Sequence, residues 1–365
     1  MLSVQNCSVL AKLEAQEKIE AVELIFFPGC PQSSTWSLEN FFLRLGLPKW
    51  TIDSIAEYFA MLVGSTLSSE TTNTPSCNEY NISIPLNDSS FLLQEEQFSK
   101  DKCMVLYIFG FTSDANGEQA QNIIDAYLQQ GIYNVLLLDY SDITQNNLYT
   151  ISVSLSSYLA PVVAQVLDDL IDGGVELCHL AGHSLGAQTA SDISRSMRNR
   201  VPHIIGLEPA GPLYYPPINC SEALNENDAD CVEVVHTDGG GLGAPLSFTS
   251  GRNEFYVNGG TRTQPGCDDY RLPTLSSLNP ETGCSHNRVT SIYAEALRNP
   301  ERLIGINCSS WDDFKSGTCE GNALMTIGSC SNSIPPGTYY LRTNDKAPFG
   351  KGAEGIEPAS DDNSR

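Results

Sequence analysis

The chain has few basic side chains: 20 Lys and Arg stand against 44 Asp and Glu, which gives a net charge of −24 over 365 residues. A charge of this sign disfavours nucleic acids and strongly anionic lipid surfaces, since no cluster of basic residues offsets it. Long apolar runs are also missing, and we therefore expect no transmembrane segment. Residues 1–11 lack the charged start and the apolar centre of a signal peptide, so no signal peptide can be read.

Cysteine, by contrast, is abundant, with 12 residues, and Asn-x-Ser sequences occur repeatedly. Cysteine in this amount is typical of proteins from oxidising compartments, where such Asn residues can carry glycans. We therefore expect an extracellular, secreted protein with disulfide bonds; the alternative is a reduced cytosolic protein with inert thiols. The oligomeric state is not indicated. The Asn-x-Ser sequences begin at Asn6, Asn81, Asn87, Asn219 and Asn307.

Strands and helices alternate from Met104 onward, which predicts an α/β fold with a mostly parallel central sheet and helices on both faces. We expect residues 77–349 to form this domain. Residues 1–76 are set apart as an N-terminal extension of unknown role, and residues 350–365 as a disordered acidic tail. The expected strands are Met104–Ile108, Val135–Leu138, a run from Val175 to Ala181, Ile204–Leu207 and Cys231–Val235; the expected helices are Glu118–Gln130, one over residues 155–170 that Pro161 starts or kinks, and one from about Val289.

The segment from Gly182 to Gly186 contains the pattern Gly-x-Ser-x-Gly between an apolar strand and a predicted helix. In a tight turn at Ser184 a side chain at either glycine would collide with its neighbours, so the two glycines relieve the crowding. Such a turn holds a serine hydroxyl above the sheet as a nucleophile, and the helix N-terminus directs the amide of Leu185 toward an oxyanion. The alternative is an ordinary glycine-flanked turn.

A serine nucleophile needs a histidine base, and the sequence has only five histidines. His286, in the segment Cys284–Arg288 before a predicted helix, is preferred because nucleophile, acid and base follow in that order in sheet-based hydrolases. His236, at the end of the strand Cys231–Val235, remains the alternative. The other histidines lie within or beside the strands and the turn, and we interpret them as structural.

The histidine in turn needs a carboxylate that fixes its tautomer and stabilises its charged form. Glu208 meets this need, because it ends the strand Ile204–Leu207 and Pro209 terminates that strand. Asp238 is the rival, since it ends the next strand in the segment His236-Thr237-Asp238.

These and further segments resemble the pancreatic lipase family of α/β-hydrolases, particularly its insect and phospholipase A1-like members. The resemblance covers about residues 79 to 350 and implies that Ser184 is the nucleophile, Glu208 the acid and His286 the base. The segments are Gly182–Ala187, Gly206–Pro212, Val234–Gly240, Phe255–Gly260, Gln264–Cys267, Cys284–Arg288, Cys308–Cys319 and Gly337–Phe349.

Two positions depart from the family pattern. The family usually has Asp where Glu208 stands, which keeps the charge but adds a methylene group. It commonly has His where Phe109 stands, in the segment that matches the oxyanion-hole turn. Because backbone N–H groups, here those of Phe111 and Leu185, hold the oxyanion, the change at Phe109 need not abolish activity.

The resemblance also implies a lid over the active site between Cys267 and Cys284, closed by a disulfide. Its apolar underside would consist of Tyr270, Leu272, Leu275 and Leu278. The alternative is a disulfide-tied surface loop with no gating role. A second expected cysteine pair, Cys220 and Cys231, brackets an acidic loop. Asn225 and Asp228 of this loop align with a calcium-binding segment in some relatives; we expect no cofactor, and a solvated acidic loop rather than a calcium site.

By this resemblance the chain is a secreted hydrolase that cleaves carboxylic esters of lipids, triacylglycerols or phospholipids, through an acyl-enzyme. The implied partner is a lipid ester at a lipid–water interface. One alternative is a catalytically weak or inactive lipid-binding or storage protein, because the family includes insect yolk proteins. Another is a carboxylesterase that acts on esters other than lipids.

Overall fold

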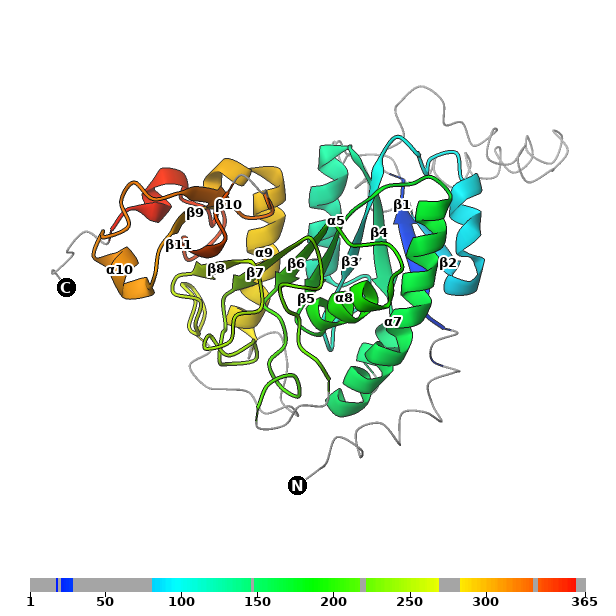
Figure 1. Ribbon diagram of the computed structural model, residues 1–365, viewed down its shortest axis with the longest axis horizontal. Coiled ribbons are helices and arrows are strands. Elements are labelled where there is room, and N and C mark those ends of the chain that lie inside the picture. The colour runs from blue at the N-terminus through cyan, green and yellow to red at the C-terminus, as the bar shows by residue number, and fades with distance from the viewer. Residues whose placement is uncertain are drawn as a thin grey trace, which may run out of the picture.

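The structure is a computed structural model in which one sheet of 11 strands forms the centre of the described chain (Figure 1). The strand order is β10-β9-β11-β8-β7-β6-β5-β3-β4-β1-β2. Neighbouring strands from β4 across to β11 run parallel, which confirms the predicted fold class. The described residues are 18, 21–28, 81–145, 148–216, 221–268, 283–330 and 334–358.

The parallel strands consist largely of buried apolar residues, as expected for a sheet that is covered on both faces. Their carboxyl ends lie at one edge of the sheet, where loops can gather side chains from several strands. The parallel strands are β3 (Cys103–Ile108), β4 (Tyr133–Asp139), β5 (Leu177–His183), β6 (His203–Leu207), β7 (Cys231–His236), β8 (Asn253–Val257) and β11 (Gly337–Leu341).

Two pairs of helices cover the two faces of the sheet (Figure 1). On one face α5 (Glu118–Gln130) packs against α9 (Cys284–Arg298), and on the other α7 (Tyr149–Asp172) packs against α8 (Leu185–Ser196). The predicted helix Glu118–Gln130 is thus confirmed. Shorter elements are α6 (Ser141–Thr144), α10 (Trp311–Lys315), η2 (Leu86–Gln94), η3 (Pro300–Arg302) and η4 (Gly352–Ile356).

Antiparallel strands complete both edges of the sheet. At one edge β9 (Ile304–Asn307) pairs with β11 and β10 (Leu324–Thr326). At the other, β1 (Glu23–Phe27) pairs with β4 and with β2 (Ile82–Pro85). The expected boundary at residue 76 therefore does not hold for β1, because its buried apolar side chains belong to the core of the same sheet.

The long helix α7 is the one helix of the described chain whose length and composition alone would suffice to cross a bilayer. Of the most apolar 18-residue stretch of this helix, 56% is buried inside the structure. The helix packs against α8 and η2, among other elements. This burial is typical of a core helix. Pro161 lies inside the helix, which continues on both sides of it.

Two expected boundaries were wrong. Helix α9 begins at Cys284 and not near Val289, so His286 lies in its first turn. The tail is also ordered further than expected: η4 lies within it, and the amide of Arg342 donates to the carbonyl of Gly355. Backbone hydrogen bonding, which composition does not report, accounts for this order. Residues 359–365 lie outside the described residues.

Four disulfides join the cysteines of the described residues, none of which is free. Cys231 is bonded to Cys330 and therefore not to Cys220, so the cysteine pair expected around the acidic loop was wrong. The cause is the topology, since β7 and the segment after β10 meet only in the folded sheet. The other pairs are Cys103–Cys178, Cys267–Cys284 and Cys308–Cys319.

Candidate active site

Ser184 lies in a sharp turn between β5 and α8, with φ 54° and ψ −118°. Such a backbone conformation is rare for a residue with a side chain and persists only where its surroundings enforce it. Both flanking glycines are required by close contacts. A Cβ atom on Gly182 would lie 2.3 Å from the carbonyl oxygen of Gly186, and one on Gly186 would lie 2.1 Å from that of Ile108.

His286 reaches Ser184 from the first turn of α9. Its Nε2 atom lies 2.8 Å from Oγ of Ser184, although 102 residues separate the two in the sequence. A second histidine helps to place the backbone of this turn, because Nε2 of His183 donates to the carbonyl oxygen of His286 at 3.2 Å. His183 was predicted to be structural, but this contact with His286 was not predicted.

Glu208 follows the last residue of β6 and is fully buried, with φ 45°. Its Oε2 atom accepts hydrogen bonds from the amides of Thr237 and Asp238. Its Oε1 atom points toward Gly243, where an added Cβ would lie 1.7 Å away. Neither this Oε1 atom nor Nδ1 of His286 has a hydrogen-bond partner among the described residues.

Asp238 is the carboxylate with a recorded contact to the base: its Oδ2 atom lies 3.9 Å from Nδ1 of His286. Both Asp238 oxygens are also held by the guanidinium of Arg262, with Nε 2.7 Å from Oδ1 and Nη2 2.5 Å from Oδ2. The amide of Leu242 donates to Oδ2 as well. Arg262 was not predicted to be a site residue. Its ion pair with Asp238 joins two distant points of the chain, and no short sequence pattern indicates such a contact.

The surroundings of these groups shift their proton affinities strongly. Burial lowers the pKa of His286 to about 3, and the nearby Arg262 guanidinium contributes to the decrease. Burial raises the pKa of Glu208 to about 8; the Asp238 carboxylate adds to the rise, and the bonds from the Thr237 and Asp238 amides oppose it. The base is therefore neutral near pH 7, as proton abstraction from a serine requires.

The turn after β3 faces Ser184. Phe111 lines the same cleft as the serine, while Leu185 is the first residue of α8, where a backbone N–H has no acceptor within the helix. Phe109 is 1% exposed and packs on Tyr140, with ring centroids 4.9 Å apart. Its side chain is therefore part of the core beneath the turn, which explains why an apolar residue fits there.

A cleft of about 320 Å³ opens above Ser184 and His286. Part of its wall is apolar and comes from Phe111, Tyr149, Pro212 and Leu242. The aromatic rings of Phe111 and Tyr149 meet edge to face, with centroids 5.1 Å apart. Such a wall suits an aliphatic chain next to the nucleophile.

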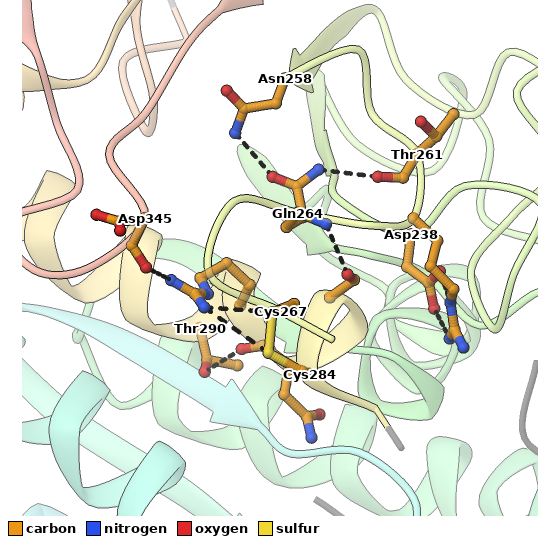
Figure 2. The surroundings of a disulfide bond; sticks show 12 residues. Asp238, Asn258, Thr261, Gln264, Cys267, Cys284, Thr290 and Asp345 are labelled. Carbon is orange, nitrogen blue, oxygen red and sulfur yellow. Dashed lines mark hydrogen bonds and ion pairs between the residues drawn. A yellow bond between two sulfur atoms is a disulfide. The ribbon is translucent and has the colours of Figure 1, made fainter. Parts of the chain in front are cut away.

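The disulfide Cys267–Cys284 lies at the start of α9 (Figure 2), two residues before His286 in the sequence. Figure 2 shows Gln264 tying the preceding loop together: its side chain accepts from Asn258 at 2.8 Å and donates to the carbonyl of Thr261 at 3.0 Å. The cysteines that delimit the expected lid are thus joined. The predicted lid residues Tyr270, Leu272, Leu275 and Leu278 lie outside the described residues.

His236, the alternative base, makes no recorded contact with Ser184. Its ring is buried, stacks on Tyr256 at 4.8 Å and lies 4.0 Å from a carboxylate oxygen of Glu254. The structure therefore brings together Ser184 and His286, and not Ser184 and His236.

The acidic loop with the calcium-like sequence is held by an arginine. Arg195 donates to both carboxylate oxygens of Asp228, at 2.8 and 2.9 Å, and Ser191 and the amide of Asn225 donate to Oδ2. Calcium requires six to eight oxygen ligands, and a guanidinium beside Asp228 repels a second cation. The carboxylate of Asp228 is therefore already engaged by hydrogen-bond donors of the chain itself.

Comparison with known proteins agrees with this geometry. The family model described as Lipase matches residues 73–349. Lipase member H-B of Xenopus laevis is 34% identical over 247 residues, 62% of this chain and 52% of that protein. Pancreatic lipase-related protein 3 of Homo sapiens is 29% identical over 356 residues, 89% of this chain and 70% of that protein.

A third relative, phospholipase A1 2 of Vespa affinis, is 30% identical over 262 residues, 67% of this chain and 74% of that protein. The chain spans about half the length of the lipase member H proteins that it matches. The family match covers well over half of the chain, including Ser184, Glu208 and His286. The chain therefore belongs to the Lipase family.

Proposed function

We propose that the chain hydrolyses carboxylic esters of lipids through an acyl-enzyme on Ser184. The observation that carries this proposal is the 2.8 Å contact between Nε2 of His286 and Oγ of Ser184, in a turn that presents the serine to a cleft. Relatives named as pancreatic triacylglycerol lipase and phospholipase A1 support lipid esters as the substrate class.

The reaction follows from the positions of these groups. Ser184 Oγ attacks the ester carbonyl while His286 Nε2 accepts the hydroxyl proton, and the amides of Phe111 and Leu185 stabilise the oxyanion. His286 then gives this proton to the leaving alcohol as the ester C–O bond breaks. In the second half, His286 takes a proton from water, the hydroxide attacks the acyl-enzyme, and Ser184 regains a proton as the fatty acid leaves.

We propose Glu208 as the acid of the triad. Its Oε1 atom and Nδ1 of His286 are a buried acceptor and a buried ring nitrogen that both lack partners among the described residues. Asp238 contacts both residues, through its amide to Oε2 of Glu208 and through its carboxylate 3.9 Å from Nδ1 of His286. A buried polar group without a partner is costly, which favours a hydrogen bond between these two atoms during the reaction. Asp238 is the second candidate, favoured by its 3.9 Å contact with the base, although Arg262 already engages both of its oxygens.

The experiment that tests the proposed function compares the wild type with Ser184→Ala. We expect a fluorophosphonate probe to label the wild type and not the variant, because only a serine activated by its base reacts quickly. Hydrolysis of a soluble p-nitrophenyl ester should fall by about three orders of magnitude or more. Circular dichroism of the variant should match that of the wild type. Equal hydrolysis by both proteins contradicts the proposal.

A lipid-binding or storage role is the second candidate, because Phe109 and Glu208 stand where the family usually has His and Asp. The same probe separates the two functions. A storage protein would bind lipid but leave the probe unreacted.

We also propose an extracellular location. The support is the pairing of every described cysteine in disulfides, which persist in oxidising compartments. Fractionation of cells that express the full-length gene tests this location: the protein is expected in the medium, and retention in the cytosol contradicts it.

A further inference from the structure

The guanidinium of Arg288 lies against the disulfide Cys267–Cys284, whose surroundings Figure 2 shows. Its Nη2 atom is 3.2 Å from Sγ of Cys267 and 3.7 Å from Sγ of Cys284. Its Nη1 atom donates to the carbonyl oxygen of Asp345 at 3.1 Å, and its Cζ atom lies 4.7 Å from the ring centroid of Phe349. These contacts hold a positive charge next to both sulfur atoms.

A cation in this position favours exchange of the disulfide with thiols. In such an exchange a thiolate attacks one sulfur and expels the other as a thiolate, and the reaction is faster when the expelled thiolate is more stable. A neighbouring guanidinium stabilises a thiolate. By contrast, the sulfurs of Cys231 and Cys330 are contacted by the side-chain amide of Asn253, which carries no net charge. The surroundings of Cys267–Cys284 are therefore those of a reactive disulfide.

Exposure selects the sulfur that a thiol can attack. Cys284 is partly exposed, whereas Cys267 is only 5% exposed and lies nearer to the guanidinium of Arg288. An attacking thiolate therefore forms its new bond to Sγ of Cys284. The bond between the two cysteines breaks, and its electron pair stays on Sγ of Cys267 beside the cation.

Hydrogen bonds that do not involve the disulfide hold the loop of the expelled cysteine. The amide of Gln264 donates to Oγ of Ser285 at 2.8 Å, and its side chain donates to the carbonyl oxygen of Val257 at 2.9 Å. The amide of Cys267 in turn donates to the carbonyl oxygen of Gln264 at 2.9 Å. The Cys267 thiolate therefore stays near Cys284, where it can attack the mixed disulfide and expel the thiol again.

We propose that Cys284 is a site of reversible modification by a small thiol, through exchange with the disulfide Cys267–Cys284 that Arg288 promotes. Cys284 is the first residue of α9, and His286 follows two residues later. The mixed disulfide therefore adds a group to the helical turn that carries the proposed base, and we expect it to slow ester hydrolysis. This effect on hydrolysis rests on the proposed function, whereas the exchange does not.

The test treats the purified protein with reduced glutathione, blocks free thiols with N-ethylmaleimide at intervals and maps the peptides by mass spectrometry. We expect the earliest product to carry glutathione on Cys284 and N-ethylmaleimide on Cys267. The disulfide Cys103–Cys178 is the internal reference, because both of its cysteines are partly exposed and exposure alone would favour its exchange. Glutathione on Cys267, or earlier opening of Cys103–Cys178, would overturn the proposal.

The variant Arg288→Met removes the charge and keeps an apolar side chain. We expect the rate of exchange at Cys267–Cys284 to fall about tenfold in this variant, and Arg288→Lys, which keeps a cation, to retain more of the rate. Arg298→Met is the matched control and should leave the rate unchanged, because Arg298 lies on the same helix and bonds Asn122 and Gln129. An unchanged rate in Arg288→Met would overturn the proposal. If Arg288→Met does not fold by circular dichroism, Arg288→Gln takes its place with the same expectation.

Activity distinguishes failure of this inference from failure of the proposed function. The isolated glutathione adduct should hydrolyse a soluble p-nitrophenyl ester about tenfold more slowly than the unmodified protein, as for a displaced base. The rate should recover as the disulfide re-forms after free glutathione is removed. Equal rates of adduct and unmodified protein would overturn the effect on hydrolysis. If the adduct forms on Cys284 and the unmodified protein hydrolyses no ester, the proposed function fails and the modification site stands.

Discussion

Oε1 of Glu208 and Nδ1 of His286 are both buried, and neither has a hydrogen-bond partner among the described residues. Asp238 borders both groups, since its amide donates to Glu208 and its carboxylate lies 3.9 Å from His286. Two carboxylates are therefore candidates for the acid that orients the imidazole, and experiment can distinguish them.

If Glu208 orients the base, Glu208→Gln should lower kcat by about two to four orders of magnitude, because the imidazolium loses its counter-charge. Asp238→Asn should have the smaller effect, since Arg262 holds that carboxylate in the ground state. Steady-state kinetics on a soluble ester measure both changes, with thermal unfolding as the control for folding. The reverse order of effects would assign the acid to Asp238.

The raised pKa of Glu208 predicts an alkaline rise in activity. If Glu208 is the acid of the triad, its carboxyl group must be ionised to stabilise charged His286; its pKa lies at about 8, so kcat/KM should then increase with pH through about 8. A pH–rate profile of the wild type from pH 5 to 10 measures this rise. Glu208→Gln should remove it, and a rise of the same size in that variant would show that another group is responsible.

Arg262 should hold the pKa of His286 down. Burial is the main cause of the low pKa and the Arg262 guanidinium is the second, so Arg262→Met should raise the pKa of His286. The Asp238 carboxylate, freed from its ion pair, would act in the same direction. NMR titration of the ring of His286 measures the shift, and a fall or no change in the variant contradicts this role.

Phe109→His, which restores the family's usual residue, should destabilise this chain. The ring is buried on Tyr140, so a polar imidazole there should cost roughly 1–3 kcal/mol in free energy of unfolding. Activity should change little at temperatures where the variant is folded, since backbone amides hold the oxyanion. Urea unfolding and kcat measure the two effects, with Phe109→Leu as the apolar control. A large loss of kcat without a loss of stability would mean that Phe109 takes part in catalysis.

Glu233 should make the fold less stable at alkaline pH. Burial raises its pKa to about 8 from the ordinary 4.5, while a bond from the amide of Gly328 opposes the rise. The stability that protonated Glu233 contributes is complete below pH 4.5 and is lost as the pH rises to about 8. Glu233→Gln should therefore lose less Tm than the wild type between pH 4.5 and 8.5. Exposed Glu301→Gln is the control, and parallel Tm curves for Glu233→Gln and the wild type would contradict the prediction.

Local pattern was enough to predict the sharp turn at Ser184. The glycines flanking Ser184 are required by contacts within a few residues and with one adjacent strand, and such requirements are visible as a short motif. The central strands and α5 were likewise predicted, because their apolar periodicity reports burial directly.

Features that depend on distant chain segments were missed. The strand β1 belongs to the sheet only through its pairing with β4, more than a hundred residues away. The bond from His183 to the backbone of His286, and the ion pair of Arg262 with Asp238, arise from loop geometry that has no repeating pattern. The pairing of Cys231 with Cys330 depends on the same long-range topology.

The disulfide Cys103–Cys178 connects the amino-terminal parts of β3 and β5, and the opposite ends of these two strands carry Phe111 and Ser184. Slippage of one strand by a single residue would displace the two groups relative to each other by about 3.3 Å. A covalent bond at the far side of the sheet therefore fixes the register that aligns Oγ of Ser184, the proposed nucleophile, with the amide of Phe111, the proposed oxyanion donor. A reducing environment could thus disturb turnover without altering any atom that meets the ester.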